Sequence, residues 1–489
     1  MNKPIRAVSI FCMALFLALM VNATYVQYVD AGDLASDPNN RRVIAAAFSR
    51  ERGAILVGRD AIAESVPSDD EYKFQRQYPK PLLYAPVTGA FSYFTQSGIE
   101  RSQNDVLSGE DSRLFVTRLV DMFTNSEPKG GNVTLTLDPA AQQAAYDGLM
   151  GLPGPVEGAV VAIAPSSGKI LAMVSVPSYD PNRLASHRFG EVADASNDLE
   201  DDEAEPLINR AISKRLPPGS TFKLVTAAAA IESGNYDADS KVPGGPTYQL
   251  PLTSGPTGLI DNEGRSCGTN RIPFVQAMEN SCNTTFAALA VELGPDAMLE
   301  QAEKFGFNSQ YLDDLGGQAT SVFPEEADQA QVGQTGIGQF DVSATPLQMA
   351  MVAAAIGNGG SVMKPYIVDE VRSPNLQVLD KTGDRELSQA VSSTTASELT
   401  DLLVATVDTG TASPAAIPGI KVAGKTGTAQ SGNPEVPPYA WFVSFAPADD
   451  PQVAVAVMIE KAGIERGEIA GGRLAGPIAR SVMEAVINQ

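Results

Sequence analysis

An apolar run at residues 224–231 sets the strongest constraint on how this chain folds. The run reads Leu-Val-Thr-Ala-Ala-Ala-Ala-Ile and directly follows the heptapeptide PPGSTFK. This composition predicts a helix from Ser220 to Ser233, with Gly234 as its stop. Because the helix is apolar on nearly every side, we expect it to be buried in a large core. Ser220 and Lys223 stand three positions apart, so both side chains project from one face of that helix.

The pairing of a serine with a buried lysine predicts an activated nucleophile. A lysine that enters an apolar core loses hydration, and its pKa falls toward the ~7–8 that suits a general base. The Ser220 hydroxyl lies at the helix N-terminus, where free N–H groups favour developing negative charge. A serine N-cap followed by a snorkelling lysine is the common structural alternative, so this motif needs support from the rest of the chain.

Composition argues against several other chemistries. The one histidine, His187, lies in a polar stretch where we expect an exposed loop, so a Ser-His-Asp triad has no positioned base. With one histidine and three cysteines, one of them Cys12 near the N-terminus, the chain is poorly supplied for a zinc site. We expect neither a metal nor a cofactor. A net charge of −23 argues against nucleic acid as a partner.

Two further motifs follow the serine helix in order. Ser-Cys-Asn at 281–283 precedes a helical run at 285–290. Lys-Thr-Gly-Thr at 425–428 reads as a strand, because two more β-prone segments follow it as a hairpin. Another Lys-Thr-Gly, at 381–383, is followed by a charged turn, and we interpret it as chance. The trio S-x-x-K, S-D-N and K-T-G belongs to class A β-lactamases and penicillin-binding proteins, and S-C-N here matches its middle member at the first and third positions.

The chain resembles the class B penicillin-binding proteins, and the resemblance extends beyond these motifs. It covers most of residues 40–489 and is weak between about 60 and 130. Further segments match the family: a hairpin at 158–175, Asn209-Arg210-Ala211, Thr345-Pro346-Leu347-Gln348 and the membrane-proximal Arg52-Gly53. The resemblance implies an α+β fold of the β-lactamase/transpeptidase type, with an antiparallel sheet flanked by helices. The active site would lie between the Ser220 helix and the Lys425 strand.

The resemblance also implies a role for each motif residue. Ser220 would attack the penultimate D-alanine carbonyl of a stem peptide and form an acyl-enzyme. Lys223 would accept the serine proton, and Ser281 would relay a proton to the leaving D-alanine. The other groups would bind the substrate. Asn283 would hydrogen-bond its peptide backbone, and Lys425 would lie near its terminal carboxylate. Thr426, Gly427 and Thr428 would form the strand beside the substrate, with the two threonine hydroxyls on the carboxylate and the backbone N–H groups of Ser220 and Thr428 as an oxyanion hole. β-Lactam antibiotics would acylate the same serine.

Transfer of the acyl group to an amine of a second stem peptide would cross-link peptidoglycan, and this is the function that we predict. The same motifs serve a D,D-carboxypeptidase or a β-lactamase, in which water attacks the acyl-enzyme. A non-catalytic β-lactam sensor or division scaffold is a further alternative, against which the full set of motif residues argues. The expected partners are stem peptides, β-lactams, the membrane, a lipid-linked glycan polymerase and other proteins of division or elongation.

The N-terminus predicts the compartment. Lys3 and Arg6 precede an apolar stretch from 7 to 26, close to the ~20 residues that span a bilayer. Acidic residues follow, so we expect a single-pass cell-membrane anchor with the N-terminus inside and the catalytic part outside. A cleavable signal peptide ending at 21–23 is the alternative, and the resemblance favours the anchor.

We divide the chain into three parts. Residues 1–30 form a cytoplasmic stub and an anchor, 31–150 an N-terminal pedestal or dimerisation domain, and 151–489 the transpeptidase domain. A strand is expected at 132–138 and a helix from 139 to 149 at the junction. No separate glycosyltransferase domain fits before residue 150.

Two cysteines outside the anchor, Cys267 and Cys282, predict a disulfide in an exported protein. The bridge would close a loop worth ~3 kcal/mol in the chain-entropy model. It would also brace the loop that carries Ser281 and Asn283. Two reduced thiols are the alternative.

Overall fold

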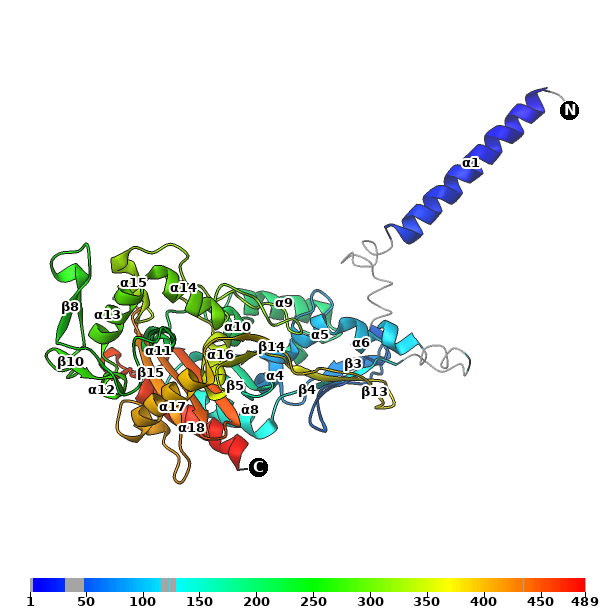
Figure 1. Ribbon diagram of the computed structural model, residues 1–489. Helices are drawn as coiled ribbons and strands as arrows, with labels where there is room; N and C mark the ends of the chain where they lie inside the picture. Colours follow the sequence, from blue (N-terminus) through cyan, green and yellow to red (C-terminus); the bar gives the residue numbers. More distant parts are fainter. Residues whose placement is uncertain (1–2, 31–47, 116–122, 124–128, 434, 489) are drawn as a thin grey trace.

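The structure is a computed structural model that describes residues 3–30, 48–115, 123, 129–433 and 435–488. A long helix, α1 (Lys3–Tyr28), stands apart from the folded body, and none of its residues is buried (Figure 1). Its 26 residues are long and apolar enough to cross a membrane. A helix of suitable length and composition is therefore present where the sequence predicted the anchor. The acidic residues Asp33 and Asp37, which follow it, lie outside the described residues.

A five-stranded antiparallel sheet forms the centre of the C-terminal part. Its strands run in the order β15-β16-β17-β5-β6, so β15 lies at one edge. The predicted hairpins at 158–175 and 440–459 supply four of them, and the Lys425 strand supplies the fifth. The bounds are β15 (Ala423–Ala429), β16 (Tyr439–Ala446), β17 (Val453–Lys461), β5 (Glu157–Ile163) and β6 (Ile170–Val176).

Helices cover both faces of this sheet, as a sheet with two apolar faces requires. Along β17, Val455 and Val457 pack with α8 (Pro139–Met150) and α18 (Gly471–Ile487). Ala454 and Ala456 face the opposite cluster, which includes α16 (Pro346–Gly357). The alternation follows from the two-residue period of a strand. The α+β architecture predicted from the sequence is confirmed.

The serine helix lies within the larger cluster, and its apolar run is buried from Leu224 to Ile231 as predicted. It begins with a 3₁₀ turn, η3 (Gly219–Phe222), and continues as α11 (Lys223–Glu232). Side chains three positions apart eclipse one another in a 3₁₀ turn, so Ser220 and Lys223 still share a face. The neighbouring helices are α12 (Phe274–Glu279), α13 (Asn283–Leu293) and α17 (Ser393–Asp408).

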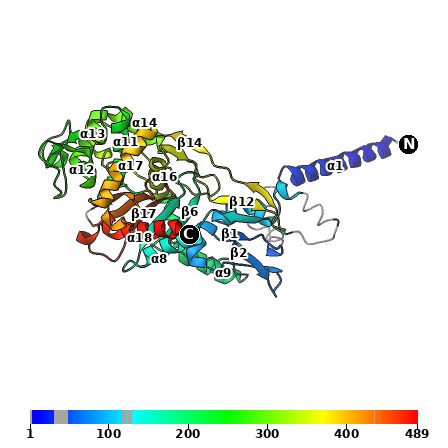
Figure 2. The same cartoon turned by 60° about the horizontal axis from the view of Figure 1, so that its bottom comes forward.

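A second sheet lies in the membrane-proximal part, with the order β13-β12-β4-β1-β2-β3. The strand expected at 132–138 is β4 (Asn132–Leu135), which pairs with β1 on one side and β12 on the other. The other bounds are β1 (Ile55–Val57), β2 (Asp60–Pro67), β3 (Phe74–Gln77), β12 (Val368–Arg372) and β13 (Val378–Lys381). Two of its strands therefore come from late in the chain, and Figure 2 shows β12 beside the N-terminal strands.

The second Lys-Thr-Gly belongs to this membrane-proximal sheet. Lys381 is the last residue of β13, and its Nζ pairs with Glu370 at 3.0 Å. The charged turn predicted after it is short, because β14 begins at Glu386. This copy thus lies in a different sheet from Lys425.

Shorter elements complete the described residues. They are α4 (Pro81–Thr88), α5 (Gly98–Ser102), α6 (Asn104–Ser108), η1 (Ser112–Leu114), η2 (Pro181–Arg183), α9 (Phe189–Glu200), α10 (Arg210–Ser213), β7 (Lys241–Pro243), β8 (Thr247–Gln249), η4 (Pro256–Gly258), β9 (Leu259–Asp261), β10 (Arg271–Pro273), α14 (Pro295–Lys304), α15 (Gln329–Thr335), β11 (Ser361–Met363), β14 (Glu386–Gln389), η5 (Ser413–Ala415) and η6 (Arg466–Glu468).

Candidate active site

Ser220 opens onto a cavity of about 220 Å³ between η3 and the edge strand β15. The cavity lies where the sequence predicted the active site. Its lining comprises Ser220, Leu259, Ile260, Asp261, Glu263, Asn283, Ile337, Gln339, Thr428 and Gln430. Ser220 and Thr428, the two predicted oxyanion donors, thus line the same space.

Gly219 brings the serine turn into contact with β15. Its φ is +53°, in the left-handed region that L side chains rarely adopt. A Cβ at this position would lie 2.9 Å from the Thr428 carbonyl oxygen. Across the contact, a Cβ on Gly427 would lie 2.9 Å from the Pro218 carbonyl oxygen. Only glycine on both sides allows the two backbones to approach this closely.

Lys223 is fully buried, and its Nζ contacts the second motif. It donates to the Ser281 carbonyl oxygen at 2.8 Å, to Ser281 Oγ at 3.2 Å and to Asn283 Oδ1 at 2.7 Å. Within the described residues, no hydrogen bond joins Ser220 Oγ to Lys223 Nζ. The helical spacing places the two residues on one face, and the fold directs the lysine toward Ser281.

Lys425 approaches the same hydroxyl from the sheet. Its Nζ donates to Ser281 Oγ at 2.8 Å and to the Thr426 carbonyl oxygen at 3.0 Å. Ser281 has a φ of +54°, an uncommon backbone conformation for a residue with a Cβ. Non-glycine residues persist in this region when their surroundings fix them, and they concentrate at functional sites. The turn therefore holds one hydroxyl between two buried lysines.

Burial and nearby positive charge favour the neutral form of these lysines. Burial is the largest cause that holds the pKa of Lys223 well below its usual value, and the positive charges of Lys425 and Arg265 lower it further. The pKa of Lys425 is also well below its usual value, because of burial and then Arg265. A neutral amine can accept a proton, which an ammonium cannot.

The Asn283 side chain connects Lys223 to the loop across the cavity. Its Oδ1 accepts from Lys223, and its Nδ2 donates to the Asp261 carbonyl oxygen at 3.0 Å. The sequence assigned this amide to the substrate backbone. In the structure it contacts protein groups and also lines the cavity, where its second Nδ2 proton has no acceptor among the described residues.

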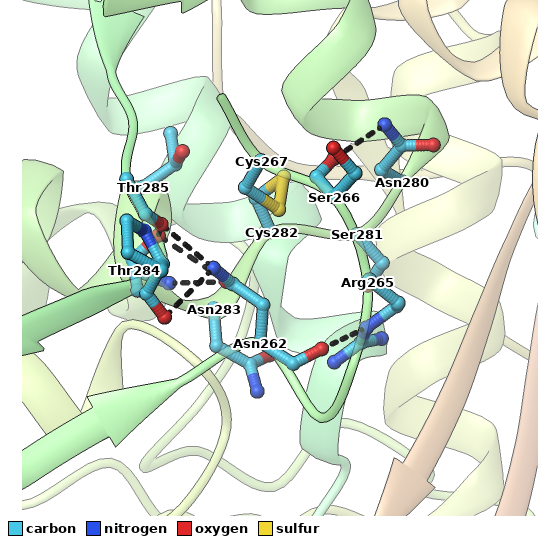
Figure 3. Close-up of a disulfide and its surroundings, with 12 residues drawn as sticks. Asn262, Arg265, Ser266, Cys267, Asn280, Ser281, Cys282, Asn283, Thr284 and Thr285 are labelled. Carbon is cyan, nitrogen blue, oxygen red and sulfur yellow. Dashed lines mark hydrogen bonds between the residues drawn. A yellow bond between two sulfur atoms is a disulfide. The ribbon is translucent and has the colours of Figure 1, made fainter. Parts of the chain in front are cut away.

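A disulfide joins Cys267 to Cys282 beside this turn, and both residues are buried. Figure 3 shows how it links the segment that carries Arg265 to the loop of Ser281 and Asn283. The Cys282 side chain is committed to the bridge, so cysteine has a structural role at the middle position of the motif. Further hydrogen bonds support the link, from Asn280 Nδ2 to the Ser266 carbonyl oxygen and from the Thr284 backbone to Asn262 Oδ1, each at 3.0 Å.

Comparisons with known proteins agree with this geometry. Residues 158–484 match the model of the penicillin binding protein transpeptidase domain, and residues 52–133 match the penicillin binding protein A dimerisation domain. The chain belongs to the penicillin-binding proteins.

Similar proteins span its full length. The peptidoglycan D,D-transpeptidase PbpA of Mycobacterium tuberculosis is 43% identical over 493 residues, which cover 100% of this chain and 99% of the relative. PbpA of Mycolicibacterium smegmatis is 43% identical over 495 residues, 100% of both chains. The structure of penicillin-binding protein A from M. tuberculosis as a ceftriaxone acyl-enzyme superposes with a TM-score of 0.86 at 42% identity, over 91% of this chain and 100% of that one.

Two residues of this penicillin-binding protein escaped the sequence analysis. Arg265 lowers the pKa of both lysines, and the only signal for it in the sequence was its position two residues before Cys267 of the predicted disulfide. Thr411 accepts a hydrogen bond from Thr426 Oγ1 at 3.1 Å, and no motif indicated it.

The prediction for His187 was wrong. Only 7% of its side chain is exposed, and Nδ1 contacts Asp70 Oδ2 at 2.5 Å. The rings of Phe48 and Tyr72 lie 5.4 and 4.8 Å from its own ring. These aromatic neighbours come from the membrane-proximal part, so the local polar sequence gave no indication of them.

Proposed function

We propose that this protein is a serine-type peptidoglycan D,D-transpeptidase that cross-links stem peptides through an acyl-enzyme on Ser220. The observation that carries the proposal is the convergence of Lys223 and Lys425 on the Ser281 hydroxyl beside the Ser220 cavity. The names of the full-length relatives support the same reaction.

In the acylation step, Ser220 Oγ attacks the carbonyl carbon of the penultimate D-alanine. As a neutral amine, Lys223 Nζ has two N–H groups to donate and one lone pair. It therefore keeps two of its three present hydrogen bonds and releases the third. Its lone pair then accepts the serine proton. Ser281 takes a proton from Lys223 and delivers one to the departing nitrogen. The Oγ–C bond forms, the C–N bond breaks, and D-alanine leaves as the amine. With a β-lactam, the departing nitrogen remains attached to the acyl group.

Substrate binding uses the strand beside the serine. Backbone N–H groups of Ser220 and Thr428 stabilise the oxyanion, where one such donor typically contributes about 2.7–4 kcal/mol. Lys425 and the hydroxyls of Thr426 and Thr428 bind the terminal carboxylate, and Asn283 uses its free amide proton on the peptide backbone. In the second step an amine of another stem peptide attacks the acyl carbon and releases Ser220.

The anchor and pedestal complete the proposal. Helix α1 holds the protein in the cell membrane with its N-terminus in the cytoplasm and residues 151–489 outside. Residues 31–150 form the pedestal, which receives β12 and β13 from the transpeptidase segment. A lipid-linked glycan polymerase and other proteins of division or elongation are the partners that this placement suits.

The test uses the full-length chain in detergent. Labelled penicillin should acylate the protein, and Ser220→Ala should abolish the label. Mass spectrometry of a reaction with a donor ending in D-Ala-D-Ala and an amine acceptor should detect the cross-linked product. A donor that only loses D-alanine would replace the proposal with a carboxypeptidase, and rapid recovery of free enzyme from penicillin would replace it with a β-lactamase.

A further inference from the structure

The hydroxyl of Thr426 is hydrogen-bonded to Thr411, a residue outside all three motifs. Thr426 Oγ1 donates to Thr411 Oγ1 at 3.1 Å. Thr426 lies on β15, and Thr411 lies in a loop at 409–412 that follows α17. Both side chains are largely shielded from solvent, which strengthens the hydrogen bond.

The same loop is hydrogen-bonded to Glu279, just before the second motif. The Thr411 backbone N–H donates to the Glu279 carbonyl oxygen at 3.2 Å, and Thr409 Oγ1 donates to Glu279 Oε1 at 2.6 Å. Glu279 is the last residue of α12 and precedes Ser281 by two positions. A Cβ on Gly410 would lie 2.8 Å from the Glu279 carbonyl oxygen, so the two segments are in direct backbone contact.

Helix α18 fixes the same pair from the opposite side. A Cβ on Gly472, at its start, would lie 2.6 Å from the Thr411 carbonyl oxygen and 3.0 Å from Thr426 Cγ2. The loop thus has little freedom to move relative to β15. Thr411 therefore holds a fixed position next to the Thr426 hydroxyl.

We propose that Thr411 is a positioning residue that directs the Thr426 proton toward the carboxylate of the acyl donor. This inference rests on the proposed function, in which Thr426 binds that carboxylate. A hydroxyl carries one proton, and a carboxylate only accepts hydrogen bonds. When a carboxylate binds, the Thr426 proton must turn to it, and Thr411 then donates its own proton to a lone pair of Thr426 Oγ1. Thr411 thereby favours acyl donors that end in a free carboxylate over those that do not.

The experiment compares two acyl donors that differ in charge only at this end. The second-order rate of acylation of the full-length protein is measured with a penicillin and with the methyl ester of that penicillin. Thr411→Val removes the hydroxyl and keeps the shape. We expect it to lower the rate with the carboxylate form about three- to ten-fold, the effect of one hydrogen bond, and to leave the rate with the ester unchanged. Thr411→Ser keeps the hydroxyl and should retain the carboxylate preference.

Two reference variants separate the outcomes. Thr409→Ala removes the contact with Glu279 without touching Thr426 and should lower neither rate selectively. Thr426→Val should abolish most of the carboxylate preference. Two results would overturn the inference about Thr411 while the proposed function stands. In the first, Thr426→Val abolishes the carboxylate preference and Thr411→Val does not. In the second, Thr411→Val slows acylation by both donors equally.

If Thr426→Val leaves the preference intact, both the Thr426 role and the inference are overturned, whereas labelling at Ser220 still tests acylation. Thermal unfolding of each variant is measured first. If Thr411→Val is not folded, Thr411→Ala replaces it with the same expected change in preference.

Discussion

Ser281 Oγ lies 2.8 Å from Lys425 Nζ, although the two residues are 144 positions apart in the chain. The contact joins the turn after α12 to the edge strand of the five-stranded sheet. Because both groups are buried, neither can exchange this partner for water without a structural opening. The lysine of the third motif therefore shares a hydrogen-bond network with Lys223 of the first motif.

The two Lys-Thr-Gly copies provide a matched pair of variants. Lys425→Ala removes a buried hydrogen-bond partner from Ser281 and should lower the rate of acylation by penicillin about 10²–10³-fold. Lys381→Ala removes an exposed partner of Glu370 and should leave that rate within about two-fold, with little change in stability because water screens an exposed ion pair. Equal effects of the two variants on the acylation rate would contradict the assignment.

Two charged residues just before the disulfide, Arg265 and Glu263, should shift the pH profile of acylation in opposite directions. The base must be neutral, so the rate rises with pH through the lowered pKa of Lys223. Arg265→Gln removes a charge that lowers this pKa, so the rise should move to higher pH. Glu263→Gln removes a charge that raises it, so the rise should move to lower pH. Stopped-flow acylation between pH 5 and about 10 measures both shifts, and a shift of the same sign for both variants would refute the base assignment.

Replacement of Gly219 should abolish acylation by displacing Ser220 rather than by unfolding the protein. Gly219→Ala forces a Cβ against the Thr428 carbonyl oxygen and should separate Ser220 from β15, with near-complete loss of penicillin labelling. Gly234→Ala is the control, because its φ is also positive, +75°, but no atom lies within 4 Å of its Cβ. The control should cost about 1–2 kcal/mol in unfolding free energy and keep its labelling. Retained labelling in Gly219→Ala would show that the close contact is dispensable.

Loss of the disulfide should weaken both stability and the second motif. The double variant Cys267→Ala/Cys282→Ala should unfold with up to ~3 kcal/mol less free energy, the cost of a loop of this length. Acylation should slow as well, since the bridge supports the turn that holds Ser281. Cys12→Ala, in the exposed N-terminal helix, is the control and should change neither quantity.

Local patterns in the sequence predicted much of the fold. The apolar run after Lys223 indicated a buried helix, and two β-prone segments around a turn indicated the hairpin of β16 and β17, because each signal depends on neighbours only a few positions away. The hairpin of β5 and β6 was predicted from the family resemblance. The family resemblance implied that Ser220 and Thr428 lie together, and both line one cavity. The two sheet-edge contacts of Gly219 and Gly427 depend on a specific approach of distant backbones, which no local pattern encodes.

The same limit explains the parts that were missed. Helical spacing could place Lys223 beside Ser220, but the acceptors of its Nζ come from a turn 58 to 60 residues later. His187 stands in a polar stretch and is covered by rings from the beginning of the chain. In each case the residues that contact the side chain are remote in sequence, so tertiary packing rather than local propensity determines where the side chain lies.

The membrane-proximal sheet has a consequence for how the protein is made. Its strands β12 and β13 end at Arg372 and Lys381, so the first hundred or so residues to leave the ribosome lack two of the six strands of this sheet. The edge of β4 stays open until more than 200 further residues have emerged, and an open strand edge invites pairing with the wrong partner. The six-stranded sheet is thus completed only when most of residues 151–489 have been synthesised, which favours assembly of the early and late segments as one cooperative unit.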